Sequence, residues 1–150
     1  MKMIKRSVLK VLLVLFCSYA ATVAQAMWSM YDLRNRISSD MDGLPLLTEL
    51  LVFSWIIPAV FLIPVMRFSF KFKWNIIPSS VVIVAFLSAY WIYLDYAIFD
   101  SRAASWSTYS RSEIIFHITG KSIIPVTVSG FFMLAAAAFI LDYKNKKDLL

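Results

Sequence analysis

Four long apolar runs, separated by short polar connections, constrain this chain more than any other feature. They cover residues 8–26, about 46–66, about 76–99 and about 122–141. The last three are each close to the ~20 residues that a helix needs to cross about 30 Å of hydrocarbon. Because 61% of the residues are hydrophobic and 16% are charged, too little polar chain remains to cover these runs in water. The sequence therefore predicts an all-α integral membrane protein, a bundle of three or four transmembrane helices.

The first apolar run has two interpretations. A basic start, "MKMIKR", precedes it, and the small-x-small sequence "AQA" ends it at Ala26. This layout is typical of a secretory signal peptide cleaved before Met27, and it also fits a retained first helix. Residues 1–26 are therefore predicted to be a signal peptide or the first transmembrane helix, and residues 27–150 the membrane domain. In both cases residue 27 emerges on the outer side.

The positive charges predict the orientation of the chain. Ten of the fifteen Lys and Arg residues lie in segments 1–10, 67–75 and 142–150, and five lie in the loops 27–45 and 100–121. Such an excess on one side marks the inner face of a membrane. Together with the signal-like start and the small size, it predicts a multi-pass protein of a bacterial inner (cytoplasmic) membrane with a cytoplasmic C-terminus.

The stretch "RFSFKFKW", residues 67–74, alternates basic and aromatic residues between the second and third runs. A strand here would have no partner, so we interpret the stretch as the inner turn between two helices. Its headgroup contacts are predicted to be Arg67, Lys71, Lys73 and Trp74. Because the other basic residues form no patch on a soluble surface, we expect lipid contacts and no nucleic-acid partner.

Two acidic residues fall within or next to the apolar runs. Asp95 lies in the outer third of the third run, where it shares one helix side with Ser88 in a small polar stripe suited to close packing. It could lie at the headgroup boundary, join two helices or handle ions. Glu49 lies at the same depth in the second run, where it could simply be an acid at a helix start that the helix dipole favours. A Glu49–Lys121 or Asp95–Arg102 pair would lock neighbouring helices together.

Two further patterns concern helix packing. Ser122, Ser129 and Ala136 recur at a spacing of seven in the fourth run and predict a packing seam, either within the bundle or in a dimer. Pro58 lies inside the second run and predicts a kink.

The outer loop 100–121 carries the signals of a short helix lying on the membrane surface. Ser110 or Ser112 could cap it, Glu113 would lie in its first turn, and Gly120 would lie near its end.

Catalytic and metal-binding motifs are missing from the sequence. Because His117 is the one histidine and Cys17 the one cysteine, neither a zinc-type ligand spacing nor an intramolecular disulfide is possible. His117 fits a surface position, with a pH-sensitive contact as the alternative. There is no nucleophile elbow, P-loop or H-E-x-x-H sequence. We therefore expect no enzyme activity and no cofactor.

These features favour an accessory protein that binds another membrane protein, or itself, through its spans or outer loops. The alternative is a small transporter or channel subunit that uses Asp95 and Glu49. A further alternative is an immunity-type protein against a pore-forming toxin. A few spans with short loops and basic inner ends look like the plan of proteins that protect bacteria from pore-forming bacteriocins, which is an analogy of architecture alone.

Overall fold

The computed structural model describes residues 2–39, 44–71, 76–104 and 109–142. Over these residues the chain forms helices and contains no strand, which confirms the all-α prediction. The elements are α1 (Lys2–Ser29), the short 3-10 helix η1 (Tyr31–Leu33), α2 (Leu46–Phe53), α3 (Ile56–Lys71), α4 (Ile76–Arg102) and α5 (Arg111–Asp142).

Four stretches of this fold are long and apolar enough to cross a membrane. They are Val8–Ser29, Leu46–Arg67, Ile77–Arg102 and Arg111–Leu141. Their outward faces carry large apolar side chains that are more than 60% exposed, among them Phe16, Val60, Phe116, Phe131 and Phe139. Exposed apolar surface of this extent is unfavourable in water. The fold therefore fits a multi-pass membrane protein.

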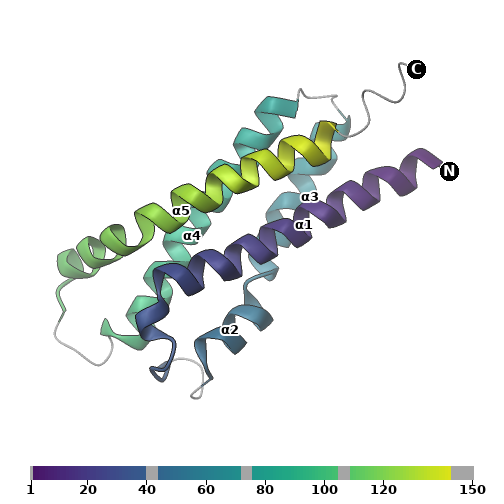
Figure 1. Cartoon of the computed structure of the whole chain (residues 1–150). Helices are drawn as coiled ribbons and strands as arrows, with labels where there is room; N and C mark the ends of the chain where they lie inside the picture. The colour runs from purple at the N-terminus through teal and green to yellow at the C-terminus, as the bar shows by residue number, and fades with distance from the viewer. Residues whose placement is uncertain (1, 40–43, 72–75, 105–108, 143–150) are drawn as a thin grey trace.

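Helices α1 and α5 run side by side in opposite directions, and α4 packs along α5 (Figure 1). The beginning of α1 and the end of α5 lie at the same end of the bundle (Figure 1). There the Lys10 ammonium of α1 donates a hydrogen bond of 2.7 Å to the carbonyl of Leu141. A cation at this position satisfies a free carbonyl and also opposes the negative end of the helix dipole.

The interior of the bundle contains two apolar clusters. One cluster joins α1, α3, α4 and α5 and includes Val14, Leu62, Leu87, Trp91 and Met133. The other lies toward the loops that follow α1 and α4, and includes Ala26, Met30, Leu46, Ile98 and Ile114. On α4, the buried Asp95 lies between Trp91 of the first cluster and Ile98 of the second.

The second apolar run is broken into two helices, where Pro58 predicts a kink. Helix α2 ends at Phe53 and α3 begins at Ile56. Because proline has no N–H and its ring clashes with the carbonyl four residues earlier, Pro58 frees the carbonyl of Ser54. The Tyr90 hydroxyl of α4 donates to that carbonyl at 3.4 Å. A neighbouring helix thus satisfies the freed backbone group, as is usual for proline in membrane spans.

Helix α3 also continues further than predicted. It runs to Lys71, so Arg67 and Lys71 belong to a helix and not to a turn. Arg67 is exposed, whereas Lys73 and Trp74 lie outside the described residues, so the headgroup contacts stay a prediction. Continuing the helix pairs more of the backbone N–H and C=O groups within the segment than a turn would.

The predicted surface helix is not a separate element. It forms the first turns of α5, which continues from Arg111 through Gly120 to Asp142. Its capping is as predicted for Ser110: the Glu113 N–H donates to Ser110 Oγ at 3.4 Å, and the Ser110 N–H donates to Glu113 Oε2 at 2.7 Å. This reciprocal pair is a capping box. The helix therefore begins where the sequence indicates, but it enters the membrane span without a break.

Candidate functional site around Asp95

One face of α1 is polar. Ser18, Thr22, Gln25 and Ser29 follow each other at spacings of four, three and four residues, which places them on one side of a helix. The first three are fully buried and Ser29 is 6% exposed. Polar side chains in a membrane span need hydrogen-bond partners, and here helix α4 provides them.

The partners are Trp91 and Asp95, one turn apart on α4 and both fully buried. The Trp91 indole N–H donates to Thr22 Oγ1 at 2.8 Å. The Gln25 amide donates to Asp95 Oδ2 at 2.8 Å, and the Ser29 hydroxyl donates to Asp95 Oδ1 at 2.8 Å. The sequence left open whether Asp95 lies at the headgroup boundary or between helices, and in the structure it is buried in the bundle interior. There it joins the first apolar run to the third.

Helix α5 contributes Ser122 to this cluster. Its side chain is 2% exposed, and its hydroxyl lies beside the Asp95 carboxylate without the geometry of a hydrogen bond. Gln25 Oε1 is also buried, and within the described part of the chain neither oxygen has a hydrogen-bond partner. We refer to Gln25, Ser29, Asp95 and Ser122 as the Asp95 cluster. Three helices converge on it.

Asp95 has no basic partner in the described ranges. The two ion pairs found there are Glu49–Arg102, with 2.6 Å between Oε2 and Nη2, and Asp32–Lys121, with 2.8 Å between Oδ2 and Nζ. The predicted pairs Asp95–Arg102 and Glu49–Lys121 are therefore wrong. Local sequence places all these groups at a similar depth, and only helix packing decides which of them meet.

Arg102 forms a second polar site at the end of α4. Its side chain is fully buried and donates to Glu49 and, at 2.9 Å, to the carbonyl of Leu44. It also donates to the carbonyl of Arg36. These bonds tie α4 to α2 and to the chain that follows η1. Glu49 thus takes part in the kind of lock between helices that the sequence predicted, with a different cation.

The Asp32–Lys121 pair lies on the surface, between η1 and α5. The Lys121 ammonium donates to the Asp32 carboxylate and lowers the pKa of that carboxyl below its usual value, first through the hydrogen bond and then through charge attraction. Lys121 is the residue before Ser122 and is therefore the lysine nearest in sequence to the Asp95 cluster. Its ammonium group is paired with Asp32.

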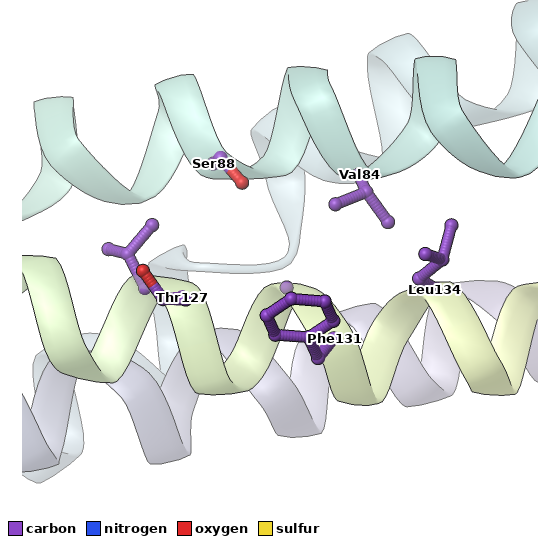
Figure 2. A pocket seen from close by; sticks show the side chains of 7 residues that line it. Val84, Ser88, Thr127, Phe131 and Leu134 are labelled. Atoms are coloured by element: carbon purple, nitrogen blue, oxygen red, sulfur yellow. The ribbon is translucent and has the colours of Figure 1, made fainter.

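Ser88 takes no part in the Asp95 cluster. It lines a groove of about 220 Å³ between α4 and α5 together with Val84, Val126, Thr127, Gly130, Phe131 and Leu134. Figure 2 shows Ser88 and Val84 facing Thr127, Phe131 and Leu134 across it. A second cavity of about 270 Å³ shares Val126 and Thr127 and is also lined by Ile92, Ile118, Thr119, Ser122 and Ile123. We call the two together the α4–α5 groove.

The predicted seam of α5 is partly buried. Ser122 is buried, whereas Ser129 and Ala136 are half-buried. The buried stripe passes beside them through Val126, Gly130, Met133 and Ala137. A Cβ atom added to Gly130 would lie 3.6 Å from Val84 Cγ1 and 3.7 Å from Ser88 Oγ. The close approach of α4 and α5 therefore centres on Gly130.

His117 is exposed and lies in a group of aromatic rings. Its ring centroid is 5.5 Å from that of Tyr109 and 6.1 Å from that of Phe99. The described residues contain no group of three or more His, Cys, Asp or Glu side chains that could hold a metal ion.

The polar face of α1 is the feature that the sequence analysis missed. Its signal was available as three polar residues inside the first apolar run, Ser18, Thr22 and Gln25, followed at the same helical spacing by Ser29 just beyond it. Comparison of the chain with models of protein families, with curated proteins and with solved structures finds no match.

Proposed function

We propose that this chain is an accessory protein of a bacterial inner membrane that binds a transmembrane helix of another membrane protein in the α4–α5 groove. The observation that supports this proposal most directly is the groove itself. Small and hydroxylated side chains line it, among them Ser88, Thr127 and Gly130. Such residues let a further helix approach closely in a membrane, where packing drives association.

The transporter alternative has less support. It needs Asp95 and Glu49 to face one polar path, but Asp95 is enclosed by α1 and Glu49 is held by Arg102. The immunity alternative has no feature of its own among the described contacts. Both remain alternatives to the accessory function, which uses surfaces that the bundle leaves uncovered.

Photo-crosslinking from matched positions tests the proposal. A photoreactive phenylalanine analogue replaces Phe131, which is 70% exposed and lines the groove, or Phe16, which is 68% exposed and lies on α1. We expect one discrete adduct from position 131, containing a second, different membrane protein, and none from position 16. Equal adducts from both positions, or an adduct that contains only a second copy of this chain, would contradict the accessory function.

We further propose that residues 1–26 are retained as the first transmembrane helix. Gln25 belongs to this segment and donates to Asp95, while Thr22 accepts the Trp91 indole N–H. Cleavage before Met27 would leave Asp95 and Trp91 without these buried partners, which is costly in a membrane. The intact mass of the protein purified in detergent is expected to be that of the uncleaved chain. A mass lacking residues 1–26 would contradict retention.

The orientation proposed for the chain places both ends in the cytoplasm. Its support is the excess of Lys and Arg in the segments 1–10, 67–75 and 142–150. A reporter that fluoresces only in the cytoplasm, fused after Leu150, is expected to be bright. A dark fusion at normal expression would contradict this orientation.

A further inference from the structure

We propose that the Asp95 cluster is a binding site for one small monovalent metal cation, of the size and charge of Na⁺. The site lies between α1, α4 and α5, and its ligands would be the Asp95 carboxylate, Gln25 Oε1 and Ser122 Oγ. This inference does not depend on the accessory function proposed above.

The charge of Asp95 is the first argument. An ionised carboxylate inside a membrane is unfavourable unless a proton neutralises it or an opposite charge compensates it, and the test below separates these two cases. The hydrogen bonds to Asp95 come from the neutral donors Gln25 and Ser29. The nearby cations are committed elsewhere, since Arg102 pairs with Glu49 and Lys121 pairs with Asp32.

The ligand atoms are the second argument. Gln25 Oε1 and Ser122 Oγ are buried oxygens without hydrogen-bond partners in the described structure. The Gln25 amide cannot be reversed without cost, because its NH₂ group faces the acceptor Asp95 Oδ2. Carboxylate, amide and hydroxyl oxygens are ligands that hard cations prefer. Because the site holds a single carboxylate, a cation of charge +1 neutralises it, whereas a divalent ion would leave a buried net charge.

An entry path is the third argument. Ser122 lies beside Asp95 and also lines the cavity of about 270 Å³ between α4 and α5, together with Thr119 and Thr127. Of the Asp95 cluster, Ser122 alone lines this cavity, so a cation that enters from the cavity would meet the Ser122 hydroxyl group first.

The test is the thermal unfolding midpoint of the full-length protein in detergent, measured at increasing NaCl. Choline chloride replaces NaCl to keep the ionic strength and pH constant. Because a ligand that binds the folded state stabilises it, the midpoint of the wild-type protein is expected to rise with sodium. Asp95→Asn is expected to lose this rise. Ser122→Ala keeps the charge but removes one ligand, and is expected to need roughly tenfold more sodium for the same rise.

A matched control separates binding from a general charge effect. Asp32→Asn removes one acidic charge at the surface and is expected to respond to sodium as the wild type does. If Asp95→Asn does not fold, Ser122→Ala carries the test. Identical midpoints of the wild type in the two salts would overturn the proposal, as would a midpoint that depends on pH and not on sodium. An unchanged sodium response in Ser122→Ala would also overturn it.

Discussion

Replacing Glu49 by Gln tests whether one buried ion pair holds together the end of the bundle where α4 ends and α2 begins. The substitution keeps the size of the side chain and one acceptor oxygen, and it removes the negative charge. Arg102 would then keep its bonds to the carbonyls of Arg36 and Leu44. Its own charge, however, would remain buried without a counter-ion.

The magnitude follows from the burial of the pair. The Arg102 side chain is fully buried and that of Glu49 is 17% exposed, with 2.6 Å between Nη2 and Oε2. Removing one partner of a buried pair typically costs ~3–5 kcal/mol. Because Gln retains an acceptor, we expect a loss of about 3 kcal/mol in the free energy of unfolding, the lower end of this range.

The free energy of unfolding can be measured by titrating the protein with a denaturing detergent in mixed micelles. Asp32→Asn is the matched control, since it makes the same chemical change in the exposed pair with Lys121, and exposed pairs contribute little. We expect a clear loss for Glu49→Gln and no measurable change for Asp32→Asn. Equal effects of the two substitutions would refute the conclusion that the buried Glu49–Arg102 pair holds α2 and α4 together.

Three further predictions concern single contacts. Thr22→Val removes the acceptor of the Trp91 indole N–H and is expected to lower the free energy of unfolding by ~1–3 kcal/mol in the same titration. Gly130→Ala adds a methyl group at ordinary contact distances, so an unfolding midpoint equal to or above that of the wild type is expected, and a large loss would contradict the packing described here. Lys121 lowers the pKa of Asp32 in the folded state. This pair therefore stabilises the fold above the unfolded-state pKa of Asp32 and loses that effect as the pH falls through the folded-state pKa. In Lys121→Gln, a carboxyl titration by NMR is expected to show a higher pKa for Asp32.

Much of the local structure was predictable from the sequence because it depends on neighbours along the chain. The lengths of the apolar runs predict three or four membrane-spanning helices, and the described structure contains four stretches of that length. Pro58 predicts a kink in the second run, where the structure has a break between α2 and α3, since a missing N–H and a ring clash act within one helical turn. The capping box at Ser110 and Glu113 is likewise a contact between residues three apart.

Tertiary structure decided which polar groups meet. The depths of Asp95, Glu49, Arg102 and Lys121 could be estimated from the sequence, but pairing depends on which helix faces which, and the composition of an apolar run does not specify its neighbours. The polar face of α1 was visible as spacing, yet its purpose appears only when Gln25 lies 2.8 Å from Asp95, 70 residues away. The sequence by itself determined where the long apolar stretches lie and where proline distorts one of them, because backbone hydrogen bonding is local. The bundle alone determined the partners of the buried charges, because those contacts form only after the helices pack.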